Sequence, residues 1–154
     1  MNFPILSSLI LLPLIGSVFI FFNKSSEKNR TIKYVSIFIT FSNFLLSLYL
    51  WYIFDKTISD FQFIEDREWI SGLINYKVGI DGISILFVVL TAFITPLCVI
   101  SVISTIKYRL KDFLIAILIM ESLMIGVFCS LDLVVFYLFF EGGLIPMFLI
   151  IGIW

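Results

Sequence analysis

Two glutamates lie inside long apolar segments of this chain, whereas every lysine and arginine lies in a loop or at a segment boundary. Glu121 is near the middle of the apolar run 113–130, and Glu141 is eight residues into the run 133–154. A charge at the centre of a bilayer costs about 2.5–3.5 kcal/mol, so acids at this depth usually face a protein interior or water and mark an ion or proton path. We therefore predict that Glu141 transfers protons, with Glu121 as a second candidate.

The residues that follow Glu141 favour proton transfer over simple packing. Pro146 has no N–H to donate to the carbonyl of Gly142, and Gly142 and Gly143 allow water or another helix to come close. The alternative for Glu141 is a permanently protonated acid that hydrogen-bonds a neighbouring helix. Glu121 has no such break beside it, so packing and proton transfer both stay open for this residue.

The two acids could share one proton, because the runs that carry them are joined by a few residues and must be antiparallel neighbours at matched depth. Their rotational positions do not follow from the sequence. No lysine or arginine reaches the predicted midplane of the membrane. Since a buried acid that titrates near neutral pH usually needs a cation nearby, we expect its partner base to come from outside this chain.

Five apolar runs must position these acids. Hydrophobic residues make up 61% of the 154-residue chain and charged residues 14%, whereas a soluble domain is about half apolar and about a quarter charged. Each run is close to the ~20 residues that cross ~30 Å of hydrocarbon, and none alternates with the period typical of barrel strands. We predict an all-α, polytopic transmembrane bundle that forms one membrane domain, with spans at 4–22, 34–54, 82–106, 113–130 and 133–154.

The basic residues predict how the spans are oriented. Seven of the ten lie in the connections 23–33 and 107–112, and three lie in the acidic connection 55–81. By the positive-inside rule, the two basic connections face the cytoplasm or matrix and the N-terminus faces outside. The first run has no basic segment before it and no cleavage pattern after it, so we expect it to stay in the membrane. The connection 55–81 alternates as two paired strands would, although an interfacial coil fits equally well.

Other residue types limit the chemistry further. Asp81 and Asp132 precede the third and fifth spans and are expected to cap these helices, with a proton exit as the alternative for Asp132. Cys98 and Cys129 lie at different depths, too far apart for a disulfide, and are interpreted as apolar fillers. The net charge of −1 gives no basic field for nucleic acid, and the absence of histidine excludes an imidazole-based site.

Three stretches of the sequence resemble one family of respiratory membrane subunits. They are 78–84 (VGIDGIS), 121–128 (ESLMIGVF), and 139–147 (FFEGGLIPM) followed by 151–154 (IGIW). On these residues the chain resembles the N-terminal portion of chain 4, called subunit M in bacteria, of NADH:quinone oxidoreductase, which is respiratory complex I. The last of the three stretches is the most specific.

The resemblance implies a longer subunit that is related to cation/proton antiporter subunits. Glu141 corresponds to the family's fifth-helix glutamate, a proton-pathway residue that pairs with a lysine on a later helix, and that helix is missing from this sequence. Glu121 corresponds to a carboxylate of the mitochondrial-type members. The redox cofactors of the complex belong to other subunits, so we expect no cofactor and no metal site in this chain.

The function that we expect is proton translocation in a mitochondrial inner or bacterial plasma membrane, coupled to NADH oxidation and quinone reduction elsewhere in the complex. The expected partners are other membrane-arm subunits, the lipid bilayer and the later helices of the same subunit. The alternatives are a subunit of a multisubunit cation/proton antiporter, and a non-catalytic structural or assembly subunit whose acids stay neutral. The apolar end of the sequence has no basic flank, so we expect the chain to be part of a larger membrane unit.

Overall fold

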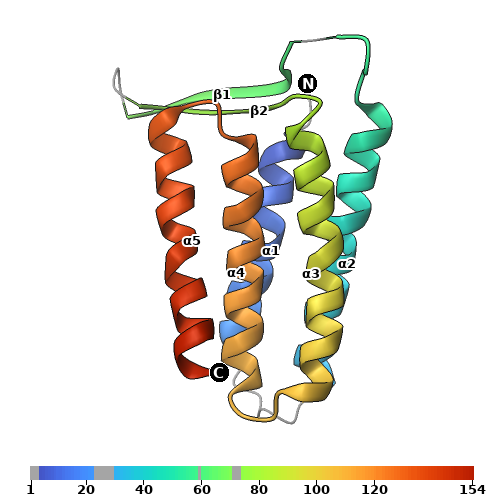
Figure 1. Ribbon diagram of the computed structural model, residues 1–154, viewed down its shortest axis with the longest axis vertical. Coiled ribbons are helices and arrows are strands. Elements are labelled where there is room, and N and C mark those ends of the chain that lie inside the picture. Colours follow the sequence, from blue (N-terminus) through green and yellow to red (C-terminus); the bar gives the residue numbers. More distant parts are fainter. Residues whose placement is uncertain (1–3, 23–29, 59, 71–73) are drawn as a thin grey trace.

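A computed structural model describes residues 4–22, 30–58, 60–70 and 74–154 of the chain. The described ranges contain five helices, each long and apolar enough to cross a membrane, and a pair of strands (Figure 1). The elements are α1 (Ile5–Phe22), α2 (Arg30–Ile53), β1 (Gln62–Ile70), β2 (Ile74–Ile80), α3 (Ser84–Thr105), α4 (Leu110–Cys129) and α5 (Leu133–Ile153). The structure therefore confirms the all-α membrane architecture with five spans.

Two helices begin earlier than the apolar runs that predicted them, and in both cases polar residues precede the run. The helix α2 begins at Arg30 rather than at residue 34, and α4 begins at Leu110 rather than at residue 113. Hydropathy marks the part of a helix that lies in lipid, whereas the hydrogen-bonded backbone continues into the adjacent polar residues. The apolar runs thus predict where the helices lie, but not the residue at which each helix begins.

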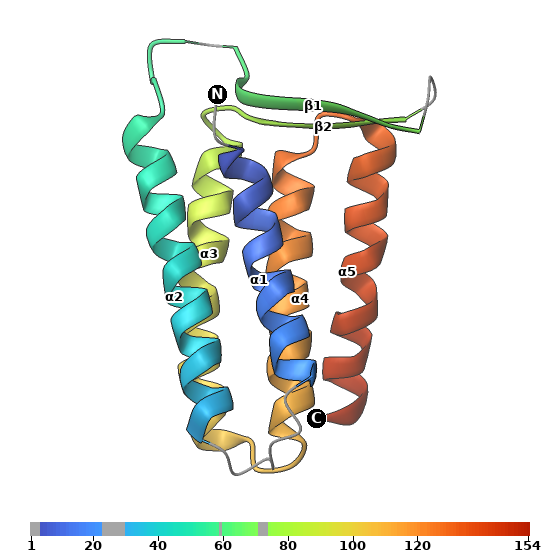
Figure 2. The same cartoon turned by 180° about the vertical axis from the view of Figure 1, so that it is seen from behind.

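The strands settle the two alternatives for the acidic connection in favour of a hairpin. Strand β1 pairs antiparallel with β2, from Gln62 opposite Ile80 to Ile70 opposite Ile74, so the interpretation as a coil was wrong. The hairpin lies across the end of the bundle where α1 begins, and the C-terminal end of α5 lies at the opposite end (Figures 1 and 2). The alternating side chains of Val78 and Ile80 are buried, as expected for strands with one face on the bundle.

One carboxylate from the hairpin holds the beginning of α1. Glu65 accepts hydrogen bonds from the backbone N–H groups of Leu6 (3.0 Å) and Ser7 (3.3 Å) and from the Ser7 hydroxyl. The first N–H groups of a helix have no partner within the helix, and a negative charge there also complements the helix dipole. The Ser7 hydroxyl also lies 3.2 Å from the hydroxyl of Tyr76, whose pKa is raised mainly by burial. The hairpin is thereby fixed over α1.

The helix α4 is the central helix, and α5 lies at one edge of the bundle (Figure 1). Packing contacts join α4 to all four other helices, whereas α5 packs mainly on α4 and on β2. Only Val135 and Pro146 are buried on α5, which stays helical through the proline. Most of the α5 surface, including Glu141, is therefore uncovered in this part of the protein.

Candidate proton-transfer site

Glu121 lies in a polar layer between two apolar clusters of the bundle. One cluster includes α4 residues up to Leu118, and the other includes α4 residues from Ile125 onward. The Glu121 side chain is 2% exposed, and its Oε1 accepts a hydrogen bond of 2.8 Å from Nδ2 of Asn43 on α2, a residue that is fully buried. Next to it on α4, Ser122 donates a 2.5 Å hydrogen bond to the carbonyl of Ile10 on α1. Buried hydrogen bonds thus join α4 to α2 and to α1 at neighbouring residues of α4.

Asn43 belongs to a line of buried polar residues along one face of α2. The others are Ser36, Thr40 and Ser47, and the spacing of four, three and four residues places all of them on one side of a helix. These three hydroxyls donate to carbonyls of α2 itself, over 2.7 to 3.1 Å. Asn43 is therefore the member of this line whose side chain bonds another helix.

A groove between α3 and α4 leads to Glu121. Its volume is about 450 Å³, and apolar side chains from both helices form most of its walls, with Ile150 of α5 at one side. The hydroxyls in the walls are those of Thr91 and Thr95, which donate to the carbonyls of Phe87 (2.8 Å) and Thr91 (2.9 Å) on their own helix. Both hydroxyls of the groove are thus bonded to their own helix, and the hydrogen bond from Asn43 reaches Glu121 from α2 rather than from the groove.

Glu141 has a different environment from Glu121. It lies mid-way along α5, its side chain is exposed, and it accepts a hydrogen bond from the hydroxyl of Tyr137 one turn earlier. Within the described ranges, no hydrogen bond joins Glu141 to Glu121. The structure therefore gives the two acids separate partners, and it does not bring them together as a pair that shares one proton.

Asp81 and Asp132 hold the beginnings of two helices, as predicted. The carboxylate of Asp81 accepts from the backbone N–H groups of Ser84 (2.7 Å) and Ile83 (3.2 Å) and from the Ser84 hydroxyl, and these bonds lower the pKa of Asp81. Asp132 accepts from the N–H groups of Val134 (2.8 Å) and Val135 (3.2 Å). Both carboxylates stabilise the beginning of a helix, because they accept hydrogen bonds from backbone N–H groups that have no partner within the helix.

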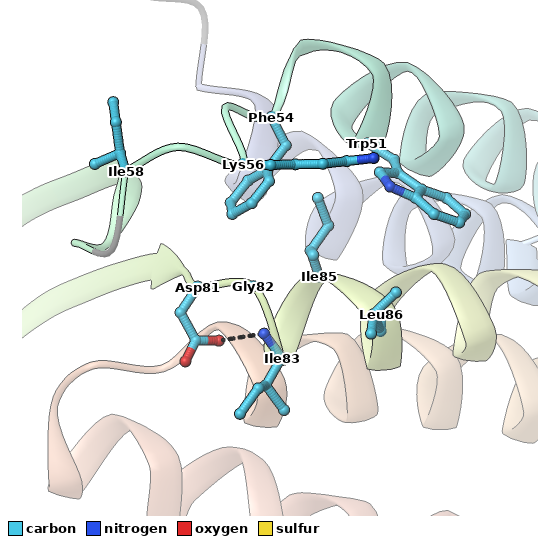
Figure 3. Close-up of a pocket in the computed structure, with 9 residues that line it drawn as sticks. All are labelled: Trp51, Phe54, Lys56, Ile58, Asp81, Gly82, Ile83, Ile85 and Leu86. Atoms are coloured by element: carbon cyan, nitrogen blue, oxygen red, sulfur yellow. Dashed lines mark hydrogen bonds between the residues drawn. The ribbon is translucent and has the colours of Figure 1, made fainter.

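Asp81 also lines a hollow of about 400 Å³ between the ends of α2 and α3 (Figure 3). The side chain of Lys56 extends across this hollow toward Trp51. None of the residues that line it also lines the groove at Glu121. The hollow is thus separate from the groove at Glu121. Among the described residues, no cluster of three His, Cys, Asp or Glu side chains could hold a metal ion.

Sequence analysis missed two residues of this arrangement, Asn43 and Glu65. The polar spacing along α2 is a signal that could have singled out Asn43, because a face with Ser36, Thr40 and Ser47 is conspicuous in an apolar span. Glu65 gave no comparable signal, because it lies in a connection rich in acids and acts on the beginning of a distant helix.

The sequence is similar to subunits of respiratory membrane complexes. NADH-quinone oxidoreductase subunit M from Rhodobacter capsulatus is 56% identical over 126 residues, which cover 82% of this chain and 24% of the relative. NADH-ubiquinone oxidoreductase chain 4 from Marchantia polymorpha is 47% identical over 150 residues, which cover 97% of this chain and 30% of the relative. The sequence thus resembles the chain 4/subunit M family. It spans about a third or less of the length of these relatives and matches their N-terminal portion.

The remaining comparisons concern the family model and the fold. No family model matches the chain. Among solved structures, a chain of the membrane-bound sulfane sulfur reductase, an archaeal respiratory membrane complex, has a TM-score of 0.75 and 18% sequence identity, covering 95% of this chain and 22% of that one. At this identity the likeness shows the fold alone. The chain 4/subunit M resemblance of the sequence is thus confirmed, and a chain of an archaeal respiratory membrane complex has the same helical fold.

Proposed function

We propose that this chain forms the N-terminal part of a proton-translocating membrane-arm subunit of NADH:quinone oxidoreductase. The observation that carries the proposal is the similarity to chain 4 and subunit M, which extends over 97% of the chain in Marchantia polymorpha. The relatives' names favour this function over a subunit of a separate antiporter or an assembly subunit. The subunit would act in a mitochondrial inner or bacterial plasma membrane, beside other membrane-arm subunits.

Glu141 is the acid that we assign to proton transfer. It lies in the middle of a span on a face of α5 that nothing in the described ranges covers, and Tyr137 is its hydrogen-bond partner. A carboxylate against acyl chains would be costly, so the rest of the complex must supply polar groups on this face. A later helix of the same subunit with a basic side chain would meet this need.

The chemical step on Glu141 is the gain and loss of one proton. A cation close to the carboxylate favours its ionised form, and removal of that charge favours protonation. Redox chemistry in other subunits would bias this exchange by moving charge along the buried groups that face Glu141. The hydroxyl of Tyr137 donates a hydrogen bond to this carboxylate. No cofactor in this chain is needed for the step.

Glu121 is the second acid in the proposal, with a lesser part. It is buried away from the open face of α5 and already has a partner in Asn43. We assign direct exchange with the partner base to Glu141 and treat Glu121 as a separate proton site inside the bundle.

The test is Glu141→Gln in the intact complex, with NADH-driven proton translocation measured in sealed vesicles. We expect nearly complete loss of coupled turnover while the complex still assembles, because glutamine keeps the size and hydrogen bonding but cannot ionise. Asp112→Asn is the control, since Asp112 is an exposed acid that pairs with Arg109 at the beginning of α4. Normal proton translocation by an assembled Glu141→Gln complex would overturn the assignment.

A further inference from the structure

The contact between Glu121 and Asn43 leaves one unsatisfied oxygen on each side chain. The amide Nδ2 of Asn43 donates to Oε1 of Glu121 over 2.8 Å. The remaining oxygens, Oδ1 of Asn43 and Oε2 of Glu121, are buried and have no hydrogen-bond partner in the described part of the chain. Both are acceptors when Glu121 is ionised, and buried polar atoms are rarely left unpaired.

One proton on Glu121 would give these two acceptor oxygens the donor that they lack. An amide and a carboxylic acid have complementary edges, because each carries one donor and one acceptor side by side. When Glu121 binds a proton on Oε2, that O–H becomes the donor that Oδ1 of Asn43 lacks, and the two groups can form two reciprocal hydrogen bonds. An ionised Glu121 offers Asn43 a single bond and leaves two buried acceptors unpaired, which is costly in a low-dielectric interior.

The surroundings also favour the neutral acid. The described spans carry no lysine or arginine near the level of Glu121, and the basic residues of α2 and α4 lie at the helix ends. On the other elements that pack against α4, the titratable side chains are Cys98 on α3, Tyr137 and Glu141 on α5, and Tyr76 and Lys77 on β2. Tyr137 is bonded to Glu141, and Lys77 pairs with Asp66 of the hairpin at 3.7 Å. None of these provides a buried cation that would stabilise an ionised Glu121.

We propose that Glu121 and Asn43 form a neutral acid–amide pair that stores one proton in the contact between α2 and α4. The proton is bound to Oε2 of Glu121, taken up from water when that O–H bond forms and returned to water when it breaks. The part that this store plays in translocation rests on the proposed function, whereas the existence of the pair does not. The pair also explains how Glu121 is kept in a span without a basic partner.

The test is infrared difference spectroscopy on the purified complex, comparing the wild type with Glu121→Gln at neutral pH. We expect the wild type to show the carbonyl stretch of a protonated carboxylic acid, and Glu121→Gln to lose it. Asn43→Leu should retain this band but move it to higher wavenumber, because the hydrogen bond to the acid is lost. Ser122→Ala is the matched control: it removes a neighbouring buried hydroxyl that bonds Ile10 rather than Glu121, so the band should not move.

Two results would overturn the pair. Absence of a Glu121-dependent band at neutral pH would mean that the acid is ionised, and a band that Asn43→Leu leaves in place would mean that the proton is held by another partner, such as water. If Asn43→Leu prevents assembly, Asn43→Gln, which moves the amide by one methylene, must also shift the band. Glu141→Gln separates the two proposals, because it should abolish proton translocation and leave the Glu121 band unchanged.

Discussion

Gly126 of α4 lies directly against the ring of Phe139 of α5, and this contact predicts a large effect of one methyl group. A Cβ atom at Gly126 would lie 2.7 Å from Cδ1 and 2.8 Å from Cε1 and Cγ of Phe139. Carbon atoms that are not bonded prefer separations of about 3.5–4.0 Å, so in Gly126→Ala the ring or the helix must move. Overpacking of this kind typically costs about 1–3 kcal/mol.

Gly143→Ala on α5 is the matched control for this substitution. Among the described residues, a Cβ atom at Gly143 meets no atom within 4 Å, so alanine there gains the same helix propensity, about 0.5–1 kcal/mol, without a clash against this part of the chain. The difference between the two variants therefore isolates the cost of the contact, at about 1–3 kcal/mol.

Amide hydrogen exchange of peptides from α5, in the detergent-solubilised complex, measures this difference as local opening. We expect exchange in Gly126→Ala to be faster than in Gly143→Ala by about 5- to 150-fold, the ratio that corresponds to this free energy. Equal exchange in the two variants would show that α5 does not pack on α4 through Phe139 and Gly126. The position that the structure gives to Glu141 would then fail as well.

Three helix beginnings give further predictions that the same exchange measurement checks. Glu65→Ala should loosen the first turn of α1 by about 0.5–2 kcal/mol, whereas Glu65→Gln, which keeps an oxygen acceptor, should lose less. Asp132→Ala should loosen the first turn of α5 by a similar amount, whereas Asp132→Asn, which keeps an oxygen acceptor, should leave this turn as stable as in the wild type. The folded-state pKa of Asp81 is lowered, so its cap is present above the ordinary aspartate pKa and is lost as pH falls through the lowered value. Ser84→Ala removes the hydroxyl that lowers this pKa, so protection of the α3 amides should be lost at higher pH than in the wild type; an unchanged midpoint would contradict this reasoning.

The five helices were predictable because a helix that crosses a bilayer is surrounded by lipid. Its length and its hydropathy are therefore set by the thickness and the apolar character of the bilayer. The helix ends were less predictable, as at Arg30, because the backbone bonds continue where the hydropathy stops. The caps at Asp81 and Asp132 were predictable because a cap acts within a few residues of its own position.

The environments of the two acids could not be predicted from local sequence. The partner of Glu121 is Asn43, which is 78 residues earlier in the chain, and only the packing of α2 on α4 brings them together. The same packing determines that Glu121 faces inward and Glu141 faces outward, since both lie in similarly apolar helices. The sequence pattern predicts the position of each acid along its helix, whereas the direction in which each side chain points depends on the tertiary contacts.

The exposed face of α5 predicts what would cover it in the subunit that we propose. Large apolar side chains near Glu141 in the sequence of α5 are also exposed, among them Phe140, Leu144, Ile145 and Phe148. In the relatives, the matched region makes up about a third or less of the subunit, so other helices can cover this face. We expect the cover to be apolar opposite these side chains and basic opposite Glu141.

An experimental structure of the complete complex tests the proton-transfer assignment most directly, through the distance from the Glu141 carboxylate to the nearest lysine or arginine nitrogen. We expect an ion pair within about 4 Å, on a helix that covers α5. A Glu141 carboxylate that lies against acyl chains, with Tyr137 as its one polar neighbour, would contradict it.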